Sequence, residues 1–324
     1  MPALRRLVLW EATEPDQFEA LFRHTVWPSL EALDLCILFN DGETGAGEIT
    51  ATAALAALAS AWRNTPRLRA LELGGESDVV LEAAPRALAA AGWRLQKLDI
   101  CYVGAAGMAA LAAAPSFALR ELKLDRCLIG AAGVFAIAAA SWPLEKLEFE
   151  GRPYGEPSFG PALAALSRHT SLRHLTFNSV LLGGWNIKDL IDATWPELTR
   201  LIIDQGEGGY VQVEEYEYRE LDDASFAGFP KLEVLALGSW NLTPEGAAIM
   251  ASRRWRRLRE LRLTYNALDN LGPWPVDVGA LALGSWPALE RLHLSRIKYG
   301  SPTLEAVQRW APTVTELTVE QPWV

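Results

Sequence analysis

The sequence predicts an α/β fold: a right-handed solenoid of about twelve strand–helix repeats, with a parallel concave β-sheet and convex helices arranged as a horseshoe. Three observations lead to this prediction. The pattern Leu-x-x-Leu-x-Leu, with Ile, Phe or Val at some positions, occurs twelve times. Segments with the periodicity of a helix separate successive copies. A tryptophan, in several cases followed by proline, comes shortly before the first leucine of most copies.

The twelve copies follow one another at intervals of 24 to 38 residues. They predict strands that begin near residues 4, 30, 68, 95, 119, 144, 172, 198, 232, 258, 289 and 314. Because side chains alternate across a strand, the apolar residues of each copy face one side and form a core. No repeat can bury that side alone, so neighbouring repeats must stack. We therefore expect a single domain over residues 1–324.

The segments between the strands are predicted to be helices. Apolar residues fall at helical spacing, as in Ile187, Leu190 and Ile191. A helix between parallel strands gives a right-handed crossover. The expected helices are Glu48–Trp62, Gly104–Ala114, Gly130–Trp142, Asn186–Trp195, Pro244–Trp255 and Pro302–Trp310.

Tryptophan marks the end of most predicted helices. Eight of the thirteen tryptophans lie just before a first leucine, namely Trp27, Trp62, Trp93, Trp142, Trp195, Trp255, Trp286 and Trp310. Four of them run directly into proline, which stops a helix and turns the chain towards the next strand. We expect these indole rings to be buried plugs between repeats.

These repeats resemble leucine-rich repeats of the ribonuclease-inhibitor-like class, in which each repeat carries a full helix. The resemblance runs from Leu4 to Val319. The family places Asn or Cys three residues after the third leucine to bond the turn, and Cys127 and Asn266 match this position. Other residues, such as Val180, occupy it elsewhere, which predicts irregular turns. The resemblance implies a non-catalytic protein-binding module or scaffold.

Charge and composition exclude several classes of protein. The formal net charge is −10, and residues 204–223 alone hold eight acids against one arginine. A nucleic-acid-binding protein normally carries a basic face, so we expect no nucleic-acid partner. No apolar run reaches the roughly 20 residues of a membrane helix, and no secretory signal is visible. Three cysteines without a close pair favour a reducing compartment. We expect an intracellular protein, with the cytoplasm as the default and the nucleus or an organelle left open.

Both ends of the repeat array reach the ends of the sequence. Leu4 is close to Met1, and the chain stops five residues after Val319. Solenoids normally carry polar caps on their terminal repeats. We expect either a longer gene product or end repeats that are covered in a larger assembly.

The first candidate binding surface is the concave face. The central outward position of neighbouring strands holds Asp34, Glu72 and Asp99, and like charges at this spacing repel. We predict that they bind a basic protein segment, and we add Glu148 and Glu150 as further candidates. The alternative is a solvated strand face whose acids are partly offset by basic neighbours, Lys97 or Arg69.

The second candidate is the insertion Gln205–Asp223, which lengthens its repeat to 34 residues. Loops of this length are usually functional or disordered. Its acidic and tyrosine side chains suit a basic partner, and the residues concerned are Tyr210, Glu214, Glu215, Tyr216 and Tyr218. A solvated, tolerated insertion is the alternative. A third segment carries Trp274 between two prolines and is a further contact candidate.

A run of five arginines forms a weaker candidate, and consists of Arg253, Arg254, Arg256, Arg257 and Arg259. Arginines can bind phosphate or acidic tails. The alternative is favourable placement of cations at a helix C-terminus, where the helix dipole attracts them.

The sequence predicts no enzyme, no cofactor and no metal site. Only His174 and His293 fall on the concave face, and they lie four repeats apart. His174 could meet Glu148 or Glu150, but no nucleophile or third ligand joins them. A second hypothesis is a GTPase activator, since one such family uses helical leucine-rich repeats; Arg126 and Arg152 are the arginines suitably placed. A third hypothesis is a structural subunit of an assembly.

Overall fold

The computed structural model describes residues 4–10, 20–22, 25–36, 56, 59–60, 62–74, 83–151, 159–180, 182, 184–204, 225–238, 244–264, 278–295 and 304–320. The chain divides into two compact units, Met1–Arg152 and Pro153–Val324, which we call the N-terminal and C-terminal units. Each is described by itself, and the single domain expected from the repeats stays a prediction.

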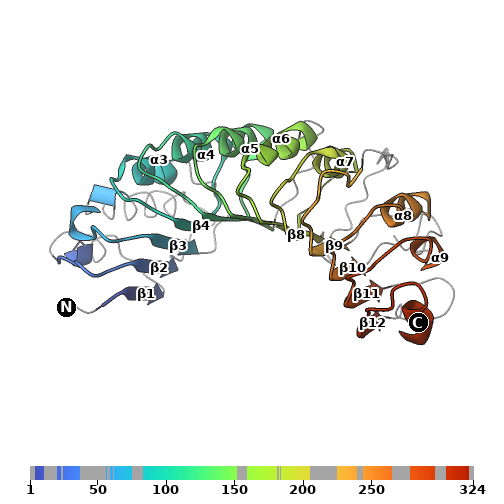
Figure 1. Cartoon of the computed structure of the whole chain (residues 1–324). Coiled ribbons are helices and arrows are strands. Elements are labelled where there is room, and N and C mark those ends of the chain that lie inside the picture. Colours follow the sequence, from blue (N-terminus) through green and yellow to red (C-terminus); the bar gives the residue numbers. More distant parts are fainter. Residues whose placement is uncertain are drawn as a thin grey trace, which may run out of the picture. The chain divides into compact units, whose positions relative to one another are not determined.

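The N-terminal unit is built on parallel strands that pair in sequence order. These strands are β1 (Arg6–Trp10), β2 (Ala32–Cys36), β3 (Ala70–Gly74), β4 (Lys97–Cys101), β5 (Glu121–Asp125) and β6 (Lys146–Glu150). The described helices are η1 (Trp62–Asn64), α3 (Ala83–Ala90), α4 (Ala105–Ala112) and α5 (Gly130–Ala139). Helices α3, α4 and α5 lie on one side of the strands (Figure 1). The other side of the sheet is called the open face below.

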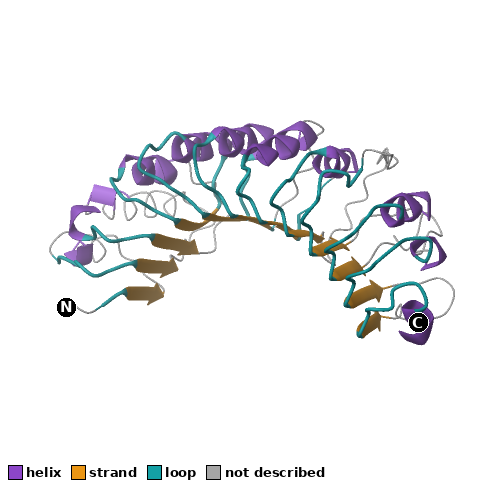
Figure 2. Ribbon diagram, viewed as in Figure 1, coloured by secondary structure: helices purple, strands orange, loops and turns teal. Residues whose placement is uncertain are grey.

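The C-terminal unit repeats this plan, again with parallel strands paired in sequence order. Its strands are β7 (His174–Asn178), β8 (Arg200–Asp204), β9 (Val234–Gly238), β10 (Glu260–Thr264), β11 (Arg291–Ser295) and β12 (Glu316–Glu320). Its described helices are α6 (Phe159–Ala165), η2 (Leu166–Arg168), α7 (Gly184–Asp192), α8 (Pro244–Ala251), α9 (Val278–Leu281) and α10 (Leu304–Gln308). Figure 2 shows the alternation of strand, loop and helix. The α/β solenoid of about twelve repeats is confirmed.

The strand register places the leucines of successive repeats side by side. In the N-terminal unit Leu71, Leu98 and Leu122 pair across β3, β4 and β5, and each is at most 1% exposed. In the C-terminal unit Leu235 and Leu261 pair in the same way and are fully buried. One apolar ladder of this kind runs through each unit, as the spacing of the motif predicted.

The strands begin two residues later than predicted. Apart from the half-buried Leu4, the first apolar residue of each motif, such as Leu68, is buried but precedes its strand. In most repeats the next two backbone N–H groups donate to a single carbonyl of the preceding repeat: Arg69 and Ala70 both donate to Glu31 O, at 2.9 and 3.0 Å. The regular ladder therefore starts only after this shared acceptor.

The helices end earlier than predicted, and at three helix ends of the C-terminal unit a tryptophan turns back onto the helix. The indole Nε1 of Trp195, Trp255 and Trp286 donates to the carbonyl five residues earlier, at 2.9, 2.8 and 2.9 Å. The last carbonyls of a helix lack partners within the helix, so this bond satisfies one of them. Among the other predicted plugs, Trp27, Trp93 and Trp142 are buried, whereas Trp310 is half-buried. The side chain of Trp62 lies outside the described residues.

The turns after the strands share one backbone feature. The residue that follows β4, β5, β6 and β7 has a positive φ, from 48° to 78°, and these residues are Tyr102, Arg126, Gly151 and Ser179. In this conformation the N–H of Tyr102 donates to Asp125 O at 3.1 Å, which extends the ladder by one bond. The thiol of Cys127 accepts from Val103 N at 3.3 Å and points to Asp125 O at 3.3 Å. Cys127 therefore bonds the turn, as expected from its position in the repeat.

Candidate protein-binding surface

Alternate positions on the strands of the N-terminal unit point to the open face, and the central one is charged on five of the six strands. The register pairs Asp34 with Glu72, Glu72 with Asp99, Asp99 with Lys123 and Lys123 with Glu148. We call these five residues the central file. Three carboxylates thus stand side by side on β2, β3 and β4, and the predicted placement of Asp34, Glu72 and Asp99 is confirmed.

Lysines and an arginine partly offset the acids of the open face, and Lys97, which was expected in this role, opposes through its charge the rise that burial causes in the pKa of Asp99. Arg6 Nη2 lies 3.5 Å from Asp34 Oδ2, and Lys146 Nζ lies 3.1 Å from Glu148 Oε1. Lys123 is shared: its Nζ lies 2.7 Å from Glu150 Oε2 and 3.9 Å from Asp99 Oδ2. Because 3.9 Å is too long for a hydrogen bond, Glu150 holds the lysine and Asp99 receives only its longer-range attraction.

Glu72 stands at the middle of the three carboxylates, and no described residue forms an ion pair with it. Three of its neighbours on the open face are small, since Ala70 precedes it, Gly74 follows it, and Ala32 lies on β2. A Cβ built on Gly74 would meet nothing within 4 Å. A foreign side chain could therefore approach Glu72 without a clash.

Asp99 shows the electrostatic consequence of this arrangement. Burial raises the pKa of Asp99 from 3.8 to about 6, Lys123 opposes this rise, and the like charge of Glu72 adds to it. The Asp99 side chain is 17% exposed. A carboxylate that is half desolvated and lacks a close cation is stabilised by any cation that approaches it.

The hollow around Asp99 is shallow, with a volume of about 50 Å³. It is lined by Lys97, Leu98, Asp99, Glu121, Leu122, Lys123, Lys146 and Glu148. Small-molecule sites are usually several times larger, from about 300 Å³ upwards. The hollow accommodates the tip of one side chain, which suits contact with a protein surface.

These findings decide the fold. Apolar residues of a twelve-fold motif form ladders on parallel strands, mostly polar residues alternate with them on the open face of the N-terminal unit, and a cysteine bonds the turn. The fold is a leucine-rich-repeat solenoid. Its assignment to the ribonuclease-inhibitor-like class stays a prediction.

Comparison with known proteins gives little else for this chain. No family model and no curated protein matches its sequence. Among solved structures it is similar to a leucine-rich-repeat protein of Leptospira interrogans, at 14% identity and a TM-score of 0.41. The match covers 98% of this chain and 79% of that one.

The open face of the C-terminal unit has a different electrostatic arrangement, which the sequence analysis missed. Glu260 is 4% exposed and lies between two arginines of the sheet. Its Oε2 accepts from Arg291 Nη2 and Nε, at 2.6 and 2.9 Å, and its Oε1 accepts from Arg262 Nε. Burial raises the pKa of Glu260, but these hydrogen bonds outweigh it and the net pKa is below the ordinary value. The alignment of Arg291 with Glu260 across adjacent repeats was the signal available in the sequence.

The remaining candidates divide into described and undescribed residues. Arg126 donates from Nη1 to the hydroxyl of Tyr102 at 2.8 Å, so its guanidinium is held at the turn. The tyrosines and glutamates of the insertion, and also Trp274 and Arg152, lie outside the described residues. Within the described ranges no three His, Cys, Asp or Glu side chains are grouped as metal ligands, and no helix is long and apolar enough to cross a membrane.

Proposed function

We propose that this chain is a non-catalytic protein-binding scaffold, and that the open face of its N-terminal unit binds a basic segment of a partner. One observation carries the proposal: Asp34, Glu72 and Asp99 stand in register on neighbouring strands, and no cation among the described residues lies within hydrogen-bonding distance of Asp99. Stacked repeats create extended surfaces of the kind that repeat proteins use to bind other proteins.

The three carboxylates differ in how well they are compensated. Asp34 has Arg6 at 3.5 Å, Asp99 shares Lys123, and Glu72 forms no ion pair with a described residue. A lysine or arginine placed above Glu72 would relieve the repulsion between the three, which lie on strands about 4.8 Å apart. The small residues beside Glu72 leave room for such a side chain. Favourable binding energy is thus available to a basic partner at this place.

The proposal is tested with a fluorescein-labelled hexalysine peptide, whose binding is followed by anisotropy at moderate salt. The variant Asp34→Asn, Glu72→Gln, Asp99→Asn removes the three charges with little change in shape. We expect it to bind about tenfold more weakly, because each charge contact contributes up to about 1 kcal/mol. The matched control removes three exposed glutamates of the C-terminal unit, through Glu245→Gln, Glu305→Gln and Glu320→Gln. It changes the net charge equally and should bind within about twofold of the wild type.

The pH dependence gives a second readout of the same surface. Because the pKa of Asp99 is about 6 in the free protein, a bound cation should lower it and release a proton. Affinity should fall as the pH decreases from 7.5 through 6, and the Asp99→Asn variant should lack this step. An equal loss of binding in the triple variant and in the control would contradict the proposed surface, as would a triple variant that binds like the wild type.

A further inference from the structure

The connection between α8 and β10 carries the run of arginines, and buried apolar residues and backbone hydrogen bonds hold it in place. Trp255 and Leu258 are buried and anchor the segment to the core. Backbone bonds hold it as well: Arg256 N donates to Arg254 O at 2.9 Å, and Arg259 N to Glu233 O at 2.8 Å. The side chains of Arg254, Arg256, Arg257 and Arg259 are therefore left at the surface.

The equivalent connection before β11 shares two anchors with this segment and lacks the arginines. Trp286 bonds a carbonyl five residues earlier, as Trp255 does, and Leu289 is buried like Leu258. There the residues after the tryptophan are Pro287 and Ala288, where the arginine segment has Arg256 and Arg257. Since a connection with neutral residues keeps both anchors, these anchors do not require arginine at 256 and 257.

Other charged residues near this connection form ion pairs, whereas most of the arginines do not. Lys231 Nζ lies 2.6 Å from Glu197 Oε1, and Arg259 Nη1 lies 3.3 Å from Glu290 Oε1. No described residue forms a salt bridge with Arg254, Arg256 or Arg257. The surface thus holds an excess of positive charge at one repeat of a chain whose net charge is −10.

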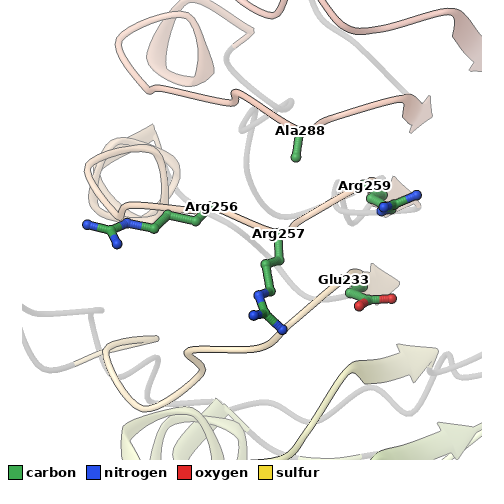
Figure 3. Close-up of a pocket in the computed structure, with 5 residues that line it drawn as sticks. All are labelled: Glu233, Arg256, Arg257, Arg259 and Ala288. Carbon is green, nitrogen blue, oxygen red and sulfur yellow. The ribbon is translucent and has the colours of Figure 1, made fainter.

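A cavity of about 250 Å³ opens at this place, lined by Glu233, Arg256, Arg257, Arg259 and Ala288. Figure 3 shows that the three guanidinium groups fan out from the segment and do not converge on one point. Ala288, from the next connection, leaves space beside them. A single phosphate would need converging donors, whereas an extended chain with several carboxylates can meet guanidinium groups that point in different directions.

We propose that this arginine edge, formed by Arg254, Arg256, Arg257 and Arg259, binds an acidic peptide segment of a protein partner. It goes beyond the proposed basic-segment site, because it lies on the other unit and selects the opposite charge. A nucleic acid fits less well, because Trp255 is 4% exposed and offers no face for base stacking.

The test uses the full chain and a fluorescein-labelled hexaglutamate peptide, with binding followed by anisotropy at 50 and 150 mM salt, about the range in which surface charges are progressively screened. The variant Arg254→Gln, Arg256→Gln, Arg257→Gln removes three exposed charges without touching Trp255 or Leu258. We expect its affinity to fall about tenfold. The matched control, Arg67→Gln, Arg86→Gln, Arg94→Gln, removes three exposed arginines of the N-terminal unit and should bind within about twofold of the wild type.

Three outcomes would overturn the proposal. Equal losses in the two triple variants would mean that the peptide senses only the total charge. If single-stranded oligothymidylate of the same charge displaced the labelled peptide at a lower concentration than unlabelled hexaglutamate does, the occupant would be a nucleic acid. A wild-type dimer in sedimentation that dissociates in the Arg254, Arg256, Arg257 variant would identify the occupant as a second copy. Hexalysine binding in the same variant should be unchanged, so a failure here is distinct from a failure of the proposed function.

Discussion

Asp99 in the N-terminal unit and Glu260 in the C-terminal unit are both carboxylates on the open face, yet their pKa values move in opposite directions. Asp99 is 17% exposed, and the nearest described cation is Lys123 at 3.9 Å. Glu260 is more deeply buried, at 4% exposed, and receives two hydrogen bonds from Arg291 and one from Arg262. The pKa of Asp99 rises to about 6, and that of Glu260 falls.

This difference shows that burial alone does not set the state of a carboxylate on such a sheet. Arginine presents a planar fork that donates two bonds to one carboxylate, as Arg291 does to Glu260. Lys123 offers one ammonium group, and Glu150 holds it at 2.7 Å. The more buried acid therefore contributes to the sheet's own stability, while the less buried one retains unsatisfied attraction for a cation.

The largest expected effect comes from substitutions in the two leucine ladders. These substitutions test whether the two units are packed alike beneath their different open faces. Leu122→Ala in the N-terminal unit and Leu261→Ala in the C-terminal unit each remove a fully buried ladder leucine. Each should lower the free energy of unfolding by about 2–5 kcal/mol, measured by denaturant unfolding. A loss below 1 kcal/mol at one site only would show that the two ladders are packed differently.

Glu260→Gln should give the next largest effect, a loss of about 1–3 kcal/mol at pH 7, because it weakens hydrogen bonds to two charged groups. The folded-state pKa of Glu260 is lowered, so its contribution is present above the ordinary pKa of 4.5 and is lost as the pH falls below it. Unfolding curves of wild type and variant should therefore converge in acid. A difference that persists unchanged at pH 3 would show that shape and not charge is responsible.

Asp99→Asn should have the smallest effect and the opposite sign. A raised folded-state pKa means that the folded protein binds more protons than the unfolded chain between about pH 4 and 6, so the wild type loses stability as the pH rises through that window. The variant removes this penalty and should be about 1 kcal/mol more stable at pH 8, with no gain at pH 4. Equal or lower stability at pH 8 would mean that Lys123 compensates Asp99 fully.

The ladders could be predicted from sequence because a strand has a strict period of two. Leu71, Glu72 and Leu73 can alternate between core and open face in only one way once neighbours repeat the pattern. Parallel stacking then places the same position of each motif side by side, which is why the row of Asp34, Glu72 and Asp99 was also predictable. The boundaries of the strands and helices were less predictable, because the shared carbonyl of Glu31 and the orientation of the tryptophan rings depend on the packed geometry.

The pairing of charges could not be predicted in the same way. A lysine side chain reaches several acids: Lys123 bonds Glu150 on the next strand, while Lys97 acts on Asp99 through its charge and forms no described ion pair. The backbone does not decide between such partners. Glu260 was not predicted because it lies at the first position of its strand and not at the central one, and because its partner Arg291 lies one repeat further along the chain.

The tryptophan bonds at the helix ends have a consequence for how such an array can grow or shrink. Trp195, Trp255 and Trp286 each bond a carbonyl five residues earlier, so donor and acceptor belong to the same repeat. A repeat of this kind carries its own helix terminator wherever it is copied. Duplication or deletion of a whole repeat leaves that local structure intact, and only the contacts at the new junction must adapt.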